Sequence, residues 1–267
     1  MSFAIYGFEQ LFSVMRYPAG ESHVTANFVP TKDNVVVVAS HVRNFEDLCN
    51  CVTANKILQH NGVEAEWFIP YFPFARHDRR RDKLDGLELK FALEMVKDLN
   101  VTVLDPHSDV LGQVKHFTQA TVVNEFLALG LENVPNPMFI IPDHGATKKA
   151  YSWLDGKMYL QATKVRDPSS GVLSGFYVYN EALAFEKDCI IVDDICDAGG
   201  TFLGIAEHLK RAGANSLTLA VTHGLFTKGL ESIQKTFSRV FTIGHWQRDV
   251  ERIGYGLFFE RNAYDRC

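Results

Sequence analysis

The stretch CIIVDDICDAGGT, residues Cys189 to Thr201, carries the clearest structural signal in this chain. Its first four residues form a short apolar run, as expected of a buried strand. Asp193 and Asp194 then stand where that strand is expected to end. Small residues follow, and from Phe202 to Leu209 apolar residues recur at helical spacing before Gly213. The stretch therefore predicts a strand, an acidic and glycine-rich turn, and a helix.

This turn combines two kinds of binding group. Glycines let backbone N–H groups approach an anion closely, and a helix N-terminus adds partial positive charge, which together favour phosphate. Asp193, Asp194 and Asp197 suit sugar hydroxyls or a cation that bridges to phosphate. A plain turn with an Asp cap would explain any one of these residues, but their order together favours a sugar phosphate site. The residues expected to hold the phosphate are Ala198, Gly199, Gly200 and Thr201.

Bulk composition limits the class of protein. The 267 residues suffice for one large or two modest domains, and the net charge of -5 predicts no general attraction for nucleic acid. The five cysteines lack metal-like C-x-x-C spacing and their number is odd, which favours reduced thiols. We find no signal peptide pattern at the N-terminus and no apolar run of transmembrane length. A cytoplasmic protein with no membrane partner is therefore expected.

Strands and helices alternate along the chain. For example, a strand is expected at Val35–Ala39 and a helix at Leu87–Leu99. Such alternation predicts an α/β fold with mainly parallel central sheets. The sequence NVPNP at Asn133–Pro137 is rich in turn residues and marks a candidate boundary. Two domains are expected, residues 1–135 and 136–267.

A basic segment with aromatic residues runs from Pro70 to Lys83, PYFPFARHDRRRDK. Five cationic side chains stand against two carboxylates, a local charge of +3. Such a segment can bind a polyphosphate and pack against a base. Charge alone would favour a solvated basic turn.

Three further segments carry candidate site residues. His107 follows a strand end in LDPHSDVLG, and Asp143 stands between a strand and a helix in IIPDHGATKK, where it can also cap the helix. Lys164 and Arg166 are one residue apart on an extended piece, so both project from one face. An exposed hairpin with unimportant charges is the alternative for this pair, and a structural role is the alternative for His107.

These segments together resemble the ribose-phosphate pyrophosphokinases, also called PRPP synthetases, where PRPP is 5-phosphoribosyl 1-diphosphate. The stretch from Cys189 to Thr201 resembles the PRPP motif, which type I phosphoribosyltransferases share. The segment from Pro70 to Lys83 resembles the nucleotide loop of the synthetases, which phosphoribosyltransferases lack. The sequence THGLF at Thr222–Phe226 also matches the synthetase pattern. The resemblance implies two phosphoribosyltransferase-like α/β domains.

The resemblance also implies an activity and roles for the site residues. The implied reaction transfers a diphosphoryl group from ATP to ribose 5-phosphate, with Mg²⁺ as cofactor, and gives PRPP and AMP. The implied catalytic residues are Lys164, Arg166 and His107. The implied ATP-binding residues are Arg76, His77, Asp78, Tyr17 and Glu21, the last two reaching a neighbouring subunit of a homo-oligomer, either a hexamer or a tetramer. The implied metal-associated residues are His107 and Asp143.

Two residues depart from the synthetase pattern. Ala19 stands where an Asn or Asp is usual, and His77 where a Gln is usual, which puts adenine recognition in doubt more than catalysis. Two alternatives stay open: a type I phosphoribosyltransferase that consumes PRPP, and a non-catalytic, synthetase-like subunit that binds and regulates partners. The basic segment and the sequence THGLF argue against the first alternative. The second is opposed by the retention of His107, Asp143, Lys164 and Arg166.

Overall fold

The computed structural model describes residues 4–31, 35–80, 83, 86–166, 173–245, 251–252 and 254–262. The chain forms two compact units: unit 1 is Met1–Thr118 with Tyr255–Cys267, and unit 2 is Gln119–Gly254. The expected division between residues 135 and 136 therefore differs from the compact units in two ways. Residues from 119 onward already pack in unit 2, and the C-terminal segment returns to unit 1.

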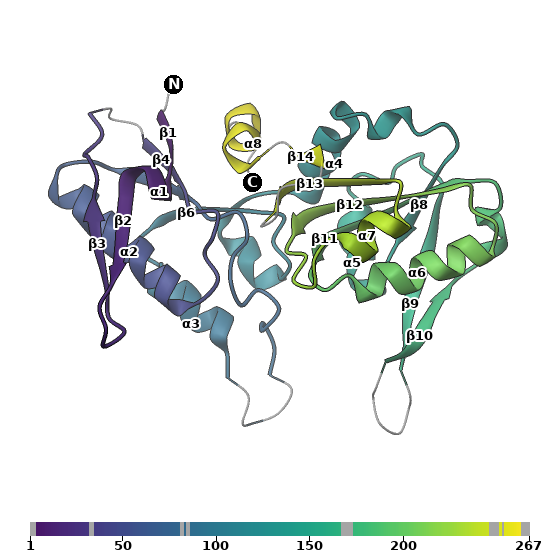
Figure 1. Ribbon diagram of the computed structural model, residues 1–267, viewed down its shortest axis with the longest axis horizontal. Helices are drawn as coiled ribbons and strands as arrows, with labels where there is room; N and C mark the ends of the chain where they lie inside the picture. Colours follow the sequence, from purple (N-terminus) through teal and green to yellow (C-terminus); the bar gives the residue numbers. More distant parts are fainter. Residues whose placement is uncertain are drawn as a thin grey trace. The chain divides into compact units, whose positions relative to one another are not determined.

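Unit 1 is built on a parallel five-stranded sheet in the order β1-β4-β5-β6-β7, with a separate antiparallel hairpin of β2 and β3 (Figure 1). Its strands are β1 (Ala4–Gly7), β2 (Phe12–Arg16), β3 (Ser22–Ala26), β4 (Val35–Val38), β5 (Ala65–Phe68), β6 (Asn100–Leu104) and β7 (Lys115–Phe117). Its helices are α1 (Phe8–Leu11), α2 (Phe45–His60), α3 (Glu88–Met95), the 3-10 helix η1 (Asp109–Gln113) and α8 (Tyr255–Asn262).

Both faces of the sheet in unit 1 are buried. All four valines of β4 are buried, as expected of a strand covered on two sides. Trp67 of β5 belongs to the apolar core that contains α2 and α3. Its neighbour Phe68 points the other way, and its ring lies 4.9 Å from that of Phe259 in α8. Helix α8 therefore completes unit 1 although it comes last in the chain.

Local signals explain where the helices of unit 1 begin and end. The Asn44 side chain accepts a hydrogen bond from the backbone N–H of Asp47 and so caps α2. The expected helix at Leu87–Leu99 is too long at its C-terminal end, because α3 ends at Met95. A turn in which the Leu99 N–H donates to the Val96 carbonyl then brings the chain into β6.

Unit 2 contains a seven-stranded sheet in the order β10-β9-β8-β11-β12-β13-β14, parallel except for the β9–β10 pair. Its strands are β8 (Pro137–Ile141), β9 (Tyr159–Arg166), β10 (Leu173–Val178), β11 (Asp188–Cys196), β12 (Ser216–Gly224), β13 (Arg239–His245) and β14 (Glu251–Arg252). Its helices are α4 (Gln119–Ala128), η2 (Leu131–Asn133), α5 (His144–Ala150), η3 (Glu181–Ala184), α6 (Gly200–Arg211) and α7 (Glu231–Thr236). The expectation of an α/β fold with mainly parallel central sheets is confirmed.

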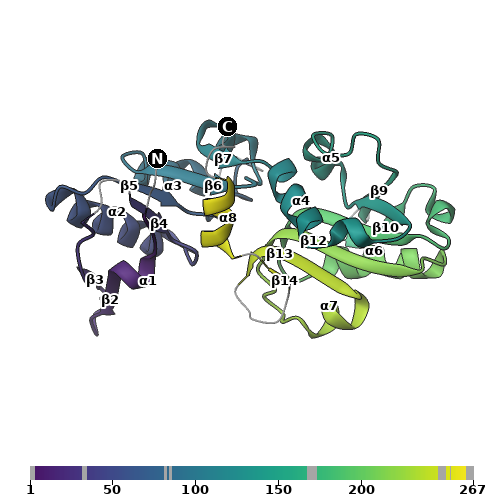
Figure 2. The same ribbon diagram turned by 90° about the horizontal axis from the view of Figure 1, so that it is seen from above.

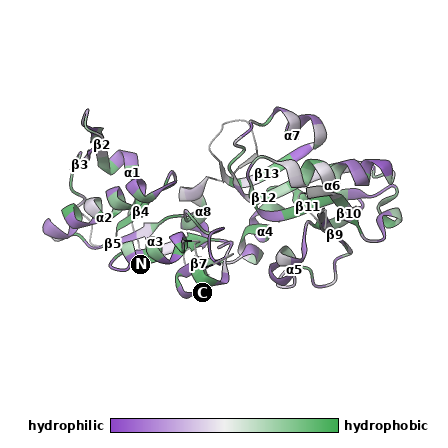
Figure 3. Ribbon diagram, turned by 90° about the horizontal axis from the view of Figure 1, so that it is seen from below, coloured by the Kyte–Doolittle hydropathy of each residue, from purple (hydrophilic) through white to green (hydrophobic). Residues whose placement is uncertain are grey.

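Helices cover both faces of the sheet in unit 2 (Figure 2). The apolar side of α6, from Phe202 to Leu209, is buried against alternate residues of β8, β11 and β12, as its spacing predicts. On the other face, the ring of Phe126 in α4 lies 6.0 Å from that of Phe241 in β13. Figure 3 shows the strands between these layers mostly in hydrophobic colours. The central strands of the sheet are therefore a buried middle layer, whereas the edge strand β10 exposes Tyr177 to solvent.

Two further findings concern the whole described chain. No helix among the described residues is long and apolar enough to cross a membrane. The four described cysteines, Cys49, Cys51, Cys189 and Cys196, are free thiols.

A close contact at Gly204 makes α6 sensitive to substitution. A Cβ at this position would lie 2.1 Å from the ring carbon Cδ2 of Phe176 in β10, whereas a Cβ at Gly256 in α8 would meet nothing within 4 Å. Gly204→Ala is expected to destabilise the protein by about 1–3 kcal/mol through overpacking. Gly256→Ala, the matched control, is expected to stabilise it by about 0.5–1 kcal/mol, because alanine favours the helix. Thermal unfolding of both variants measures this, and equal effects would contradict the assigned contact.

Candidate active site

Asp193 and Asp194 lie inside a strand and not after it. Strand β11 continues to Cys196, so the expected strand end at Val192 is wrong. The reason is the neighbouring strand: β11 stays paired with β12 as far as Cys196 and Gly224, whereas its pairing with β8 stops at Ile191 and Ile140. Beyond Ile191 one edge of β11 is therefore no longer paired with β8, and Asp193 lies on this part of the strand.

The position of this edge in the sheet favours a binding site. From β8 the chain crosses to β9 on one side, and β11 lies on the other side of β8. In open α/β sheets, ligands bind outside the carboxyl ends of the strands where the strand order reverses in this way. Asp143 follows β8 at this place, and Asp193 and Asp194 lie near the end of β11.

The glycine turn after β11 has the geometry of an anion site. Gly199 has a φ of +81°, a left-handed conformation that favours glycine, and a Cβ there would lie 2.7 Å from Cδ1 of Ile233. At Gly200 a Cβ would meet nothing within 4 Å, so the space above the first turn of α6 is open. No side chain caps α6 and no acidic residue stands in its first turn. The helix N-terminus thus offers backbone N–H groups to an anion.

The segment Thr222–Phe226 holds this turn in place. Its first three residues form the end of β12, and the N–H groups of Leu225 and Phe226 both donate to the carbonyl of Cys196, at 2.8 and 3.1 Å. The Thr227 hydroxyl donates to Oδ1 of Asp197 at 2.6 Å. The turn from Asp197 to Gly200 is therefore tied to the end of the next strand.

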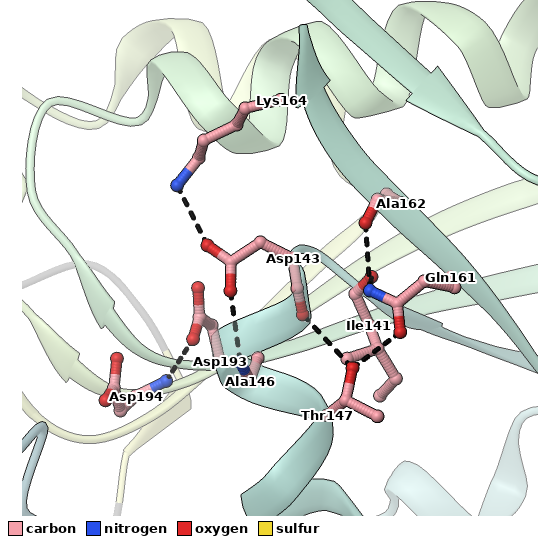
Figure 4. A network of polar contacts seen from close by, with 9 residues as sticks. All are labelled: Ile141, Asp143, Ala146, Thr147, Gln161, Ala162, Lys164, Asp193 and Asp194. Atoms are coloured by element: carbon pink, nitrogen blue, oxygen red, sulfur yellow. Dashed lines mark hydrogen bonds and ion pairs between the residues drawn. The ribbon is translucent and has the colours of Figure 1, made fainter.

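Lysines compensate two of the three clustered carboxylates, and Figure 4 shows the contact of Lys164 with Asp143. The Nζ of Lys164 lies 3.0 Å from Oδ2 of Asp143, and the Nζ of Lys149 lies 2.6 Å from Oδ2 of Asp194, which is buried. The sequence does not predict this contact of Lys149, because nothing in the spacing of α5 marks it as a partner of β11. Asp193 makes no direct contact with a cation among the described residues, and Oδ1 accepts the backbone N–H of Asp194 at 2.9 Å.

The pKa values of these carboxyl groups diverge as a result. Burial by itself raises the pKa of Asp143, but hydrogen bonds from Lys164 and the Ala146 N–H, with the charge of Lys164, outweigh it and hold that pKa below its usual value. Burial raises the pKa of Asp193 well above its usual value, and the charges of Asp194 and Asp143 raise it further. Groups perturbed in this way by burial and neighbouring charge are common at functional sites.

A network behind Asp143 fixes its position relative to Lys164 (Figure 4). Asp143 caps α5, with Oδ1 accepting the Ala146 N–H at 3.0 Å, as its position before the helix predicts. The Thr147 hydroxyl donates to Oε1 of Gln161 in β9 at 2.5 Å, and Nε2 of Gln161 donates to the Ala162 carbonyl at 2.9 Å. This network links the start of α5 to the strand that carries Lys164.

Arg166 is the last residue of β9, and its backbone pairs with Leu173 of β10. Its side chain and residues 167–172 lie outside the described part of the chain. The expected role of Arg166 therefore rests on its strand position, two residues beyond Lys164 and on the same face.

In unit 1 the structure links two of the expected segments. Arg76 and His77 are exposed in the turns after β5, and His107 is exposed after β6. Oδ2 of Asp78 accepts a hydrogen bond from the buried Ser108 hydroxyl at 2.9 Å, which ties the basic segment to the residue next to His107. Asp105, which precedes His107 and is buried, has a φ of +40°, a strained conformation of a kind that often marks functional sites.

Tyr17 and Glu21 lie elsewhere in unit 1. They form the turn of the β2–β3 hairpin, where the Tyr17 N–H donates to the Glu21 carbonyl at 2.8 Å. Both side chains are exposed, and none of their contacts in the described chain reaches Arg76 or Asp78.

His107 belongs to unit 1 and Asp143 to unit 2, and no group of three or more metal-ligating side chains is found among the described residues.

Known proteins resemble this chain in both sequence and fold. The family model of the phosphoribosyl transferase domain matches residues 155–257. The ribose-phosphate pyrophosphokinase of Corynebacterium efficiens is 26% identical over 172 residues, which are 60% of this chain and 52% of that protein. That of Maricaulis maris is 25% identical over 232 residues, 80% of this chain and 72% of that protein. The chain spans about half the length of most of the curated relatives it matches.

A solved structure shows the same fold along the whole chain. The crystal structure of phosphoribosylpyrophosphate synthetase from Mycobacterium smegmatis superimposes with a TM-score of 0.76 at 17% identity, covering 99% of both chains. Fold and site thus define an α/β protein of the phosphoribosyltransferase type. Within this class, the chain is similar in sequence and in fold to PRPP synthetases.

The raised pKa of Asp193 has a consequence for stability. Its carboxyl group is charged at neutral pH in the unfolded chain but resists ionisation in the folded one, so it destabilises the fold above its usual pKa of 3.8. Asp193→Asn is expected to raise the unfolding temperature at pH 7, and this gain should fade as the pH falls through the folded pKa toward about 4. Asp194→Asn, the matched control, removes the partner of Lys149 and should lower the unfolding temperature. A destabilised Asp193→Asn variant at pH 7 would contradict the assigned charge cluster.

Proposed function

We propose that this chain is a ribose-phosphate diphosphokinase, which transfers the β,γ-diphosphoryl group of ATP to the 1-hydroxyl of ribose 5-phosphate. The anomeric hydroxyl loses its proton and its oxygen attacks the β-phosphorus. The bond from that phosphorus to the oxygen bridging the α- and β-phosphates breaks, and AMP leaves. The observation that carries the proposal is that Lys164 contacts Asp143, whose charge acts on Asp193 of β11, the strand that leads into the glycine-rich turn of unit 2.

In unit 2, each part of the turn has a function in this proposal. The backbone N–H groups from Ala198 to Thr201, with the N-terminus of α6, hold the 5-phosphate. Asp193, Asp194 and Asp197 receive the ribose hydroxyls. Lys164 and Arg166 neutralise the charge that develops on the transferred group, since positioning and electrostatic stabilisation dominate this kind of reaction. The contact of Lys164 with Asp143 fixes the ammonium group before substrate arrives.

In unit 1, the basic segment binds the nucleotide in this proposal. Arg76 contacts the phosphates, and His77 and Asp78 lie around the nucleotide. Asp78 also accepts a hydrogen bond from Ser108, the residue next to His107. This hydrogen bond connects an ATP-binding residue to the turn that carries a catalytic residue. Tyr17 and Glu21 contact the ATP of a neighbouring subunit, which requires a homo-oligomer.

Since the described cysteines are free thiols, we place this protein in a reducing compartment such as the cytoplasm.

The carboxylates fit magnesium in kind, because this ion prefers oxygen ligands and is bound by one or two carboxylates together with substrate phosphates. Asp193 and Asp143 supply such oxygens, and a bound ion would lower the pKa of Asp193. When bound with ATP, the ion neutralises phosphate charge. His107 fits a role beside the phosphates better than direct ligation, because imidazole is an atypical ligand of this metal.

One assay separates the proposal from its two alternatives. The protein is incubated with ATP, Mg²⁺ and ribose 5-phosphate, and AMP and PRPP are measured. A diphosphokinase forms both products in equal amounts. A phosphoribosyltransferase forms neither, but consumes added PRPP when supplied with a base. A non-catalytic subunit neither forms AMP and PRPP nor consumes added PRPP. The result expected of a phosphoribosyltransferase and the result expected of a non-catalytic subunit would each reject the proposal.

The charge-stabilising role of the strand β9 pair predicts a large loss of turnover. Lys164→Ala and Arg166→Ala are each expected to reduce kcat by about 10²–10³-fold, the usual effect of losing one preorganised charge. Lys210→Ala, on the exposed side of α6 in the same unit, is the matched control and should leave kcat unchanged. Near-normal turnover in both β9 variants would remove these residues from the mechanism.

The departures at Ala19 and His77 predict weak selection of the base. Ala19→Asp combined with His77→Gln should raise the ratio of kcat/KM for ATP to that for GTP by about 5-fold to 150-fold, because each of the two restored hydrogen bonds contributes roughly 0.5–1.5 kcal/mol. His60→Gln, the same change at an exposed position at the end of α2, should leave this ratio unaltered. An unchanged ratio in the double variant would show that these positions do not face the base.

A further inference from the structure

Unit 1 contains a second concave site, away from the basic segment. A pocket of about 410 Å³ is formed by residues between Phe8 and Cys51, from α1, β2, the turn after β4 and the first half of α2. Its volume falls within the usual range for small-molecule sites of roughly 300–1,000 Å³. None of the residues assigned to ATP or ribose 5-phosphate lines it.

The apolar part of the lining suits a flat ring. Phe8 and Phe12 contact each other with ring centroids 5.3 Å apart and an angle of 40° between their planes. Val14 and Val42 also line the pocket. Val14 is 44% exposed on β2 at the rim, whereas Phe12 is buried. Aromatic side chains at such a site pack well against another aromatic ring.

A buried amide supplies an unused hydrogen-bond donor. Asn50 of α2 lines the pocket and is only 8% exposed. Its Oδ1 accepts the Ser22 hydroxyl at 2.9 Å, while its Nδ2 makes no hydrogen bond among the described residues. A buried polar group without a partner costs free energy, and a ligand that accepts this hydrogen bond would remove the cost. Neighbouring Asn55, by contrast, bonds inward to Trp67.

The charges of the lining exclude an anionic ligand. Glu9, Glu46 and Asp47 contribute three carboxylates against the single guanidinium of Arg16. Arg16 pairs with Glu46, and Nδ1 of His41 lies 3.6 Å from Oε1 of Glu9. The pocket therefore keeps a net negative charge at neutral pH, which repels phosphate and favours a neutral or cationic amine.

We propose that this pocket binds a neutral or cationic heteroaromatic amine of nucleobase or nucleoside size. The ring packs against Phe8 and Phe12, a ring nitrogen or carbonyl accepts a hydrogen bond from Nδ2 of Asn50, and an amino group faces the carboxylates. The site is separate from the proposed diphosphoryl transfer and does not depend on it. Because β2 leads directly into the hairpin turn, a ligand here contacts the strand that immediately precedes Tyr17.

Two variants on β2 test this site with adenosine as the probe. Val14 and Met15 are both exposed and alternate along the strand, so they point to opposite faces, and only Val14 lines the pocket. Calorimetric titration should show adenosine binding to the full chain and to Met15→Trp with equal affinity. Val14→Trp should bind at least about tenfold more weakly, because the indole fills the rim. No binding of adenosine at about 5 mM, or equal binding to both variants, would overturn the proposal.

Amide hydrogen exchange on the unaltered chain locates the ligand even if Val14→Trp fails to fold. Adenosine should slow exchange in residues 8–12 and 45–51, and ribose 5-phosphate should not. Protection confined to residues 71–80 would assign adenosine to the basic segment and reject the pocket. These outcomes are independent of whether the protein forms PRPP, so the proposal can fail while the proposed function holds.

Discussion

The like charges of Asp143, Asp193 and Asp194 are the constraint on which the rest of unit 2 depends. The parallel sheet brings these carboxylates to the ends of β8 and β11, where burial would make three negative charges costly. Lys164 and Lys149 compensate two of them directly, and Asp193 is left with a raised pKa. The fold thus holds an unsatisfied negative site next to an open helix N-terminus, an arrangement that a sugar phosphate with its cation would satisfy.

The surrounding structure serves to keep these groups in place. Gln161 and Thr147 fix the start of α5 to β9, and the residues after β12 hold the turn after β11 by hydrogen bonds to Cys196. In unit 1 the same principle applies on a smaller scale, since Asp78 and Ser108 join two loops that follow different strands. Rigid strands with short, cross-linked loops are suited to reactions in which positioning supplies most of the rate.

Much of the fold could be predicted from sequence because its signals are local. The apolar run at Val35–Ala39 and the helical spacing from Phe202 to Leu209 both predicted the right elements. The end of β11 was missed because pairing with β12 overrides the polarity of Asp193 and Asp194. The contact of Lys149 with Asp194 and the return of α8 to unit 1 depend on the tertiary fold and leave no local pattern.

The central claim is that the carboxylates of β11 and the glycine turn together hold ribose 5-phosphate. A crystal structure of the protein with ribose 5-phosphate tests this most directly. The account predicts the 5-phosphate within hydrogen-bond distance of the backbone N–H groups at Gly200 and Thr201, with ribose hydroxyls at Asp193 and Asp194. A sugar phosphate bound elsewhere, or bound here with its phosphate away from the start of α6, would contradict it.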